Sequence, residues 1–133
     1  MKGSKNIVVY GFVGTRFDHS INNISILQKY AELYPYYNFF GVTPLYQIFM
    51  VTKGSYEITP AGYHKKDSGV GLINFKKSTH NLFTKGFKWD INNDITLVMG
   101  SRQSSSNEIV GENVEIDTED TIVLSLQFDV DKF

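Results

Sequence analysis

Three short runs of polar and aromatic residues hold the side chains of this sequence that could do chemistry. The first, GTRFDH at 14–19, places an arginine, an aspartate and a histidine between an apolar run and a candidate helix. Such a position favours anions, because the first-turn amides of a helix are unpaired and its dipole is positive there. Arg16 could hold a phosphate through paired hydrogen bonds, and Asp18 could hold Mg²⁺, which prefers carboxylate and phosphate oxygens. The structural alternative is that Asp18 caps the helix and Arg16 is a surface charge.

The second and third runs combine a tryptophan with short hydroxyl and amide side chains. TKGFKW at 84–89 contains Trp89, the only tryptophan, which could stack on a flat heteroaromatic ring or lie over a cation. SSSNE at 104–108 offers groups that can recognise the donors and acceptors of a small polar ring. Each run also has a structural explanation, with Trp89 as a core or rim aromatic and the serine run as a solvated turn. The residues alone leave both interpretations open.

Composition excludes several classes of protein. The 133 residues suffice for one domain with a core, and a net charge of −1 provides no basic surface for nucleic acid. The chain has no cysteine, which excludes a disulfide framework and thiolate metal sites, and its three histidines lack the spacing of zinc ligands. No apolar run approaches the roughly 20 residues that span a bilayer, and the start does not resemble a signal peptide. We therefore expect a soluble, cytoplasmic protein that binds neither nucleic acid nor membrane.

A strand and a helix are predicted to position the first run. The apolar run 6–13 predicts a buried strand. Asp18 or Ser20 could cap the start of the helix that follows, and Pro35 comes after its end. The helix itself is predicted by apolar residues that recur every three or four positions, namely Ile21, Ile24, Leu27, Ala31 and Tyr34.

Short strands separated by turns are predicted to position the other two runs. Aromatic residues make up 14% of the chain, an enrichment that favours sheet. The polar run 101–108 is expected to be a loop between two strands. Many short strands at this spacing predict a mainly β fold, an antiparallel, jelly-roll-like β-sandwich preceded by one strand and one helix. The expected strands are 38–42, 45–51, 55–60, 69–75, 80–91, 95–100, 113–117 and 121–128.

The order of these runs resembles the thiamin pyrophosphokinase family over about residues 6–128. YGFVGTRFDHSINNISIL at 10–27 is similar to the family's glycine-rich segment, which continues into arginine, a hydrophobic residue, aspartate, histidine or glutamine, and a helix. The segment 83–116 resembles its second signature, a threonine–x–glycine–x–lysine–aromatic strand that leads through an asparagine-rich turn to a serine–asparagine–glutamate loop. GVGLINF at 69–75 matches the intervening strand, with Asn74 in place of a usual proline.

The resemblance implies transfer of a pyrophosphoryl group from ATP to the hydroxyethyl oxygen of thiamin, which gives thiamin diphosphate and AMP. By similarity, Asp18 would hold Mg²⁺ and phosphates, and Arg16 would support that turn as the other catalytic residue. Trp89 would cover the thiamin rings, and Ser106 and Asn107 would contact the pyrimidine. The family forms homodimers through this β-domain, and each thiamin site is completed across the interface.

The resemblance also implies a division of the chain. Residues 1–35 would be a strand–helix remnant of the nucleotide-binding α/β domain, and residues 36–133 would be the thiamin-binding β-sandwich domain. The aspartate motifs with which the family's N-terminal domain binds Mg-ATP do not occur in these 133 residues. We therefore expect this chain alone, whether an expressed fragment or a truncated gene product, to be inactive as a transferase. The alternatives are a stand-alone module that binds or senses thiamin, and a β-sandwich interaction protein without a ligand.

Overall fold

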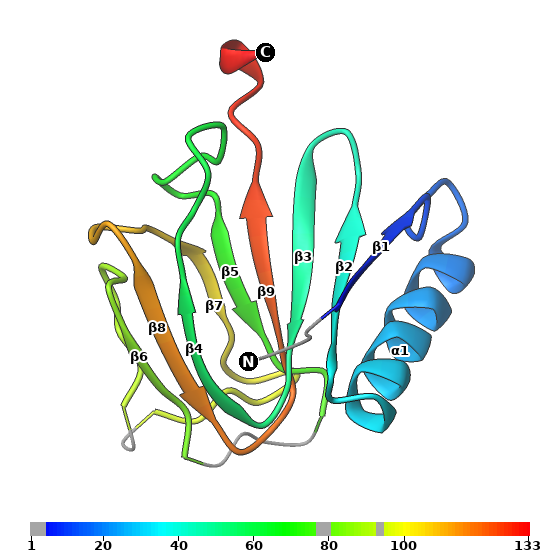
Figure 1. Ribbon diagram of the computed structural model, residues 1–133, viewed down its shortest axis with the longest axis horizontal. Coiled ribbons are helices and arrows are strands. Elements are labelled where there is room, and N and C mark those ends of the chain that lie inside the picture. Colours follow the sequence, from blue (N-terminus) through cyan, green and yellow to red (C-terminus); the bar gives the residue numbers. More distant parts are fainter. Residues whose placement is uncertain (1–4, 77–80, 93–94) are drawn as a thin grey trace.

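The computed structural model describes residues 5–76, 81–92 and 95–133, which fold into two facing sheets with a long helix against the larger one (Figure 1). The elements are β1 Lys5–Tyr10, α1 Phe17–Leu33, β2 Tyr37–Val42, β3 Tyr46–Val51, β4 Gly54–Ile58, β5 Val70–Ile73, β6 Phe83–Lys85, β7 Ser104–Asn107, β8 Val114–Thr118, β9 Ile122–Gln127 and the short 3-10 helix η1 Val130–Lys132. Within the described residues, no helix has both the length and the apolar character needed to cross a membrane.

The larger sheet has the strand order β1-β2-β3-β9-β5-β7, and the smaller has the order β4-β8-β6. β1 runs parallel to β2, and the other strand pairs are antiparallel. Alternation along β8 turns Val114 and Ile116 into the space between the sheets and Glu115 and Asp117 outward, as a half-buried strand requires. The predicted mainly β, antiparallel sandwich preceded by one strand and one helix is confirmed.

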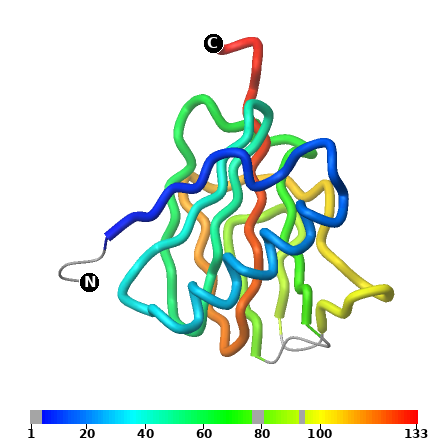
Figure 2. Tube along the Cα trace, turned by 90° about the vertical axis from the view of Figure 1, so that its right-hand side faces the viewer, coloured from blue at the N-terminus to red at the C-terminus, as the bar shows by residue number. Residues whose placement is uncertain are grey.

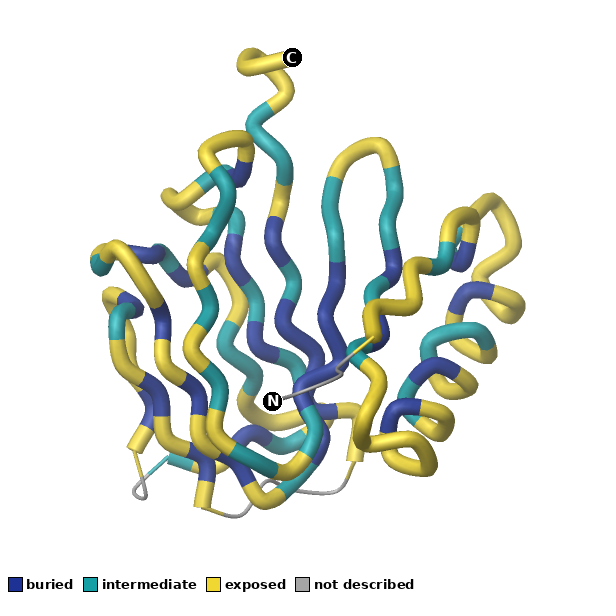
Figure 3. Tube along the Cα trace, in the orientation of Figure 1, coloured by how far each residue is buried: buried dark blue, intermediate teal, exposed yellow. Residues whose placement is uncertain are grey.

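Two apolar cores stabilise this arrangement, and buried segments mark them along the central strands in Figure 3. The first core fills the space between the sheets and includes Val51, Leu72, Leu82, Ile116 and Leu124. The second lies between α1 and the other face of the larger sheet and consists of Phe12, Leu27, Ala31, Phe39, Ile48, Met50 and Val123. Figure 2 shows α1 crossing in front of that face. The larger sheet therefore has apolar residues on both faces, and α1 covers part of one of them.

The predicted helix is confirmed, but neither predicted cap is correct. α1 begins at Phe17, so the cap position falls on Arg16, which makes no capping bond through its side chain. The Ser20 hydroxyl lies inside the first turn, where it accepts from the Gly14 N–H at 3.1 Å and donates to the Arg16 carbonyl at 3.0 Å. The Asp18 carboxylate is also inside the helix, and it is bound by the Arg16 guanidinium.

Most of the predicted strands are confirmed to within a few residues, but four predictions about strands and loops are wrong. β1 exists, yet it is largely exposed rather than buried, because it is the edge strand of its sheet. Of the predicted strand 80–91, only β6 forms. The run 95–100 contributes an isolated bridge instead of a strand, and the supposed loop 101–108 contains β7, which pairs with β5. Residue 80 and residues 93–94 of the following turn lie outside the described residues.

Candidate functional site

The turn that follows β6 carries the single tryptophan and is fixed by hydrogen bonds from within. Gly86 has φ +101°, and a Cβ there would collide with the carbonyl oxygen of Asn113. Asp90 Oδ1 accepts from the Phe87 N–H at 3.0 Å and from the Thr84 hydroxyl at 3.2 Å. These constraints end the strand that the sequence predicted to continue to residue 91.

Trp89 and Asn107 lie together at this turn. Asn107, on β7, is 1% exposed, whereas Trp89 is 54% exposed. Asn107 Oδ1 accepts from the Trp89 N–H at 3.2 Å, and Asn107 Nδ2 donates to the Trp89 carbonyl at 3.0 Å. Two of the three predicted thiamin-site residues are therefore in direct contact, and their hydrogen bonds run between a side chain and a backbone.

Lys88 and Glu108 join this cluster, although the sequence reasoning gave neither a role. Lys88 Nζ lies 4.7 Å from the centroid of the Trp89 ring and 3.3 Å from Glu108 Oε1. The signal was present, because a lysine next to the only tryptophan can place its ammonium over the ring. What sequence spacing could not provide was the partner that holds this lysine there, Glu108, which directly follows β7.

Ser106 is exposed on β7 and borders a groove on the helix-facing side of the larger sheet. Its backbone has φ +54°, in the left-handed region. The groove has a volume of about 360 Å³. Gly69 and Gly71 are among its lining residues. The lining also includes residues with hydroxyl or amide groups, namely Tyr46, Ser68, Ser105, Ser125 and Gln127. The residues that line the groove include Ser106 but neither Trp89 nor Asn107.

Arg16 and Asp18 form an exposed ion pair at the start of α1. Arg16 Nη2 lies 2.7 Å from Asp18 Oδ2, and Arg16 Nε lies 3.0 Å from Asp18 Oδ1. The hydrogen bonds from Arg16 lower the pKa of Asp18 below its ordinary value of 3.8, so this carboxylate is ionised at neutral pH. An anionic oxygen is therefore available beside the N-terminus of a long helix.

The Arg16–Asp18 pair and the Trp89 cluster lie at opposite edges of the larger sheet. The pair follows β1, at one edge, and the cluster is attached to β7, at the other (Figure 1). Five steps between neighbouring strands, each about 4.8 Å, separate these edges by about 24 Å. A single copy of the chain does not bring the predicted phosphate and thiamin residues together.

Among the described residues, no three or more His, Cys, Asp and Glu side chains are grouped so that they could hold a metal ion. Asp18 can still fit Mg²⁺ as one ligand, because this ion is often bound by one or two carboxylates together with substrate phosphates and water.

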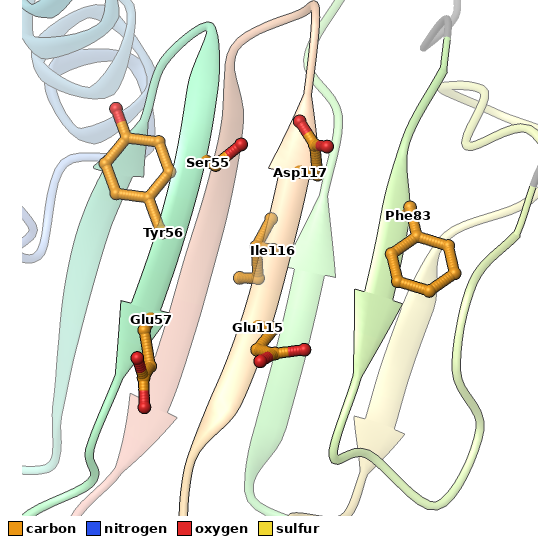
Figure 4. A pocket seen from close by; sticks show the side chains of 7 residues that line it. All are labelled: Ser55, Tyr56, Glu57, Phe83, Glu115, Ile116 and Asp117. Atoms are coloured by element: carbon orange, nitrogen blue, oxygen red, sulfur yellow. The ribbon is translucent and has the colours of Figure 1, made fainter.

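A second groove, of about 350 Å³, lies on the outer face of the smaller sheet (Figure 4). Its lining consists of Ser55, Tyr56, Glu57, Phe83, Glu115, Ile116 and Asp117, and it includes none of the predicted site residues. Polar residues that alternate outward in this way are typical of the solvated face of an antiparallel sheet.

The fold and the sequence together define the family. The vitamin B1 binding domain of thiamin pyrophosphokinase matches residues 55–123, just over half of the chain. The chain belongs to the thiamin pyrophosphokinase family. It is 34% identical over 130 residues to thiamine pyrophosphokinase from Saccharomyces cerevisiae, with 96% of this chain and 41% of that protein covered.

Two further comparisons agree. Thiamine pyrophosphokinase from Bacillus subtilis is 29% identical over 110 residues, with 78% of this chain and 46% of that protein covered. The crystal structure of yeast thiamin pyrophosphokinase superposes with a TM-score of 0.80 at 31% identity, over 95% of this chain and 41% of that one. The chain thus spans less than half the length of the curated relatives that it matches.

Proposed function

We propose that this chain binds thiamin and is the thiamin-binding portion of a thiamin pyrophosphokinase, which transfers pyrophosphate from ATP to thiamin and produces thiamin diphosphate and AMP. The observation that carries the proposal is the half-exposed indole of Trp89, fixed to β7 inside the segment that matches the vitamin B1 binding domain. Trp89 covers the thiamin rings, and Ser106 offers its hydroxyl to the pyrimidine. Asn107 is the third residue of this site.

The phosphate half of the proposed reaction belongs to Asp18 and Arg16. Asp18 would provide an oxygen ligand to Mg²⁺ bound together with the ATP phosphates, while Arg16 holds the Asp18 carboxylate in place. Bound there, Mg²⁺ would neutralise charge on the transferring phosphoryl group. In this proposal residues 1–35 derive from the nucleotide-binding α/β domain, and residues 36–133 form the thiamin domain.

We further propose that the protein is a cytoplasmic homodimer. The separation of about 24 Å between the two sheet edges supports this, since only a second copy could place an Asp18 turn beside a Trp89 turn. The net charge of −1 fits a partner set without nucleic acid, and the lack of cysteine fits a reducing compartment.

Thiamin titration into the purified chain tests the proposal. Stacking on a tryptophan contributes about 0.5–2 kcal/mol, so Trp89→Ala is expected to raise the thiamin Kd by about 2- to 30-fold. Calorimetry measures both proteins without relying on tryptophan emission. Tyr36→Ala, which removes an aromatic that is 75% exposed, is the control and is expected to bind like the parent.

Two outcomes would contradict the proposal. Absence of saturable binding at millimolar thiamin would reject thiamin as the ligand. Unchanged affinity in Trp89→Ala would reject the stacking role and leave the ligand to be held elsewhere, for example in the groove that Ser106 borders.

The second candidate function is a stand-alone module that binds or senses thiamin without catalysis. It is favoured by the sequence, because the aspartate motifs with which the family's N-terminal domain binds Mg-ATP do not occur in these 133 residues. We expect the chain alone not to release AMP from ATP and thiamin. Sustained AMP release, lost in Asp18→Asn, would show instead that these 133 residues suffice for catalysis.

A further inference from the structure

We propose that Asn107 is a positioning residue, which acts on thiamin only through Trp89 by fixing where the indole presents its open face. This inference rests on the proposed thiamin-binding function. It replaces a direct contact between Asn107 and the pyrimidine with an indirect one.

The hydrogen bonds of Asn107 leave nothing for a ligand. Its Oδ1 accepts from the Trp89 N–H and from the Glu108 N–H, at 3.2 and 2.8 Å. Its Nδ2 donates to the Trp89 carbonyl and to the Ser104 hydroxyl, both at 3.0 Å. A carboxamide has two donor hydrogens and two acceptor lone pairs, and all four are used. Because the residue is also 1% exposed, a ligand reaches neither polar atom unless these bonds break.

The side chain of Asn107 takes the place of the backbone groups of a paired strand residue. In an antiparallel pair, two opposite residues exchange both N–H···O bonds. The Asn107 carboxamide makes this same pair of bonds with the backbone of Trp89. It extends a short ladder in which Phe87 bridges Ile109 and the Lys88 N–H donates to the Glu108 carbonyl at 2.9 Å. We call this pair of hydrogen bonds between the Asn107 side chain and the Trp89 backbone the clamp. It holds Trp89 at the point where backbone pairing between residues 87–88 and residues 108–109 ends.

The ring of Trp89 is restrained as well as its backbone. Lys88 Nζ covers one face at 4.7 Å, and Glu108 holds that ammonium. A planar ligand must therefore use the opposite face. Fixing the backbone and covering one face before binding reduces the ordering cost that a ligand would otherwise meet, which is the usual gain from preorganisation.

The single tryptophan makes the clamp measurable without any ligand. Asn107→Ala is compared with Asn74→Ala, a matched control because Asn74 is also fully buried and bonds the Leu97 carbonyl and the Lys76 N–H. We expect both variants to lose thermal stability. Only Asn107→Ala is expected to weaken the near-ultraviolet circular dichroism of Trp89 and to increase its quenching by acrylamide. If Asn107→Ala does not fold, Asn107→Asp, which keeps the acceptor bonds, takes its place. Relative to the parent, it should weaken the circular dichroism of Trp89 and increase its quenching by acrylamide.

Thiamin affinity then separates a positioning role from a direct contact. Asn107→Ala is expected to raise the thiamin Kd about 2- to 12-fold, the cost of ordering one side chain on binding. Asn74→Ala should not change it. In a Trp89→Ala background, the Asn107 substitution should cause no further loss, because its effect passes through the indole.

The proposal is overturned if Asn107→Ala leaves the Trp89 signals like those of the parent, or if it weakens thiamin binding further in the Trp89→Ala background. If the parent does not bind thiamin, the proposed function fails, while the ligand-free spectra still decide whether Asn107 fixes Trp89.

Discussion

At the scale of single residues, His64 shows how burial sets a protonation state. It is 5% exposed, and its ring stacks on Phe128 at 5.6 Å between centroids. Its Nδ1 accepts from the Ala61 N–H at 3.0 Å, so the neutral ring carries its proton on Nε2, 3.3 Å from Gln47 Oε1. Burial lowers the pKa of His64 below its ordinary value of 6.5.

This histidine is expected to make the fold less stable as the pH falls below about 6.5. In the unfolded chain the ring takes up a proton near pH 6.5, whereas in the folded protein it is protonated only at a lower pH. Below about pH 6.5 the unfolded state therefore binds more protons than the folded state. The contribution of His64 to the free energy of unfolding is complete above pH 6.5 and declines below it. Urea unfolding at pH 7.5 and at pH 5.5 measures the effect.

His64→Gln should reduce the difference in unfolding free energy between these two pH values. An equal pH dependence in the parent and in His64→Gln would show that other groups cause the loss.

The residues of the site were only partly predictable. The sequence singled out the runs that contain Trp89 and Asn107, since single tryptophans and amide side chains are conspicuous. It could not show that Asn107 makes all its hydrogen bonds inside the protein, because two of the four are to Trp89, 18 residues away in the sequence. The proposed caps failed for a similar reason. Ser20 bonds the backbone of Gly14 and Arg16, Asp18 bonds the Arg16 side chain, and the cap position itself falls on Arg16.

At the scale of elements, the turn after β6 depends on the absence of a side chain at Gly86. A Cβ there would meet the Asn113 carbonyl and Val114, in addition to the strain of φ +101°. Gly100 has a similar φ of +80°, but a Cβ there would have no atom within 4 Å. A comparison of substitutions at these two glycines therefore separates the cost of backbone strain from the cost of a steric collision.

Gly86→Ala is expected to destabilise the fold clearly more than Gly100→Ala. Strain alone costs about 1 kcal/mol at either position, and only Gly86 adds the collision with β8. Denaturant unfolding measures both, and the emission of Trp89 should shift only in Gly86→Ala. Equal losses of unfolding free energy would mean that the turn adapts to the extra methyl group.

The element predictions succeeded where the apolar pattern follows the core and failed where it does not. The alternating and apolar runs of β3, β8 and β9 face a core and were found. The run 95–100 is apolar because it places Leu97 in the core, although the segment itself is irregular. The Leu97 carbonyl accepts a hydrogen bond from the Asn74 side chain instead of from a neighbouring strand. β7 was missed because an edge strand at a groove needs only backbone pairing, and its serines give no hydrophobic signal.

At the scale of the whole molecule, the two candidate half-sites at opposite edges of one sheet predict self-association. We expect analytical ultracentrifugation to give a dimer of about 30 kDa, twice the 15.1 kDa of one chain. A dilution series gives its dissociation constant. A monomer at every accessible concentration would contradict a thiamin site completed between two copies of this chain.

The position of β9 has a consequence for how the protein is made. β9 lies between β3 and β5, so Tyr46 pairs with Gln127 and Val70 with Leu126. During synthesis the nascent chain must hold β3 and β5 apart, each with an open backbone edge, until the ribosome has released residue 127. Strand pairing over such long sequence separations is slow, and open edges invite association with other chains. The emerging polypeptide should therefore depend on chaperones until its last strand closes the gap.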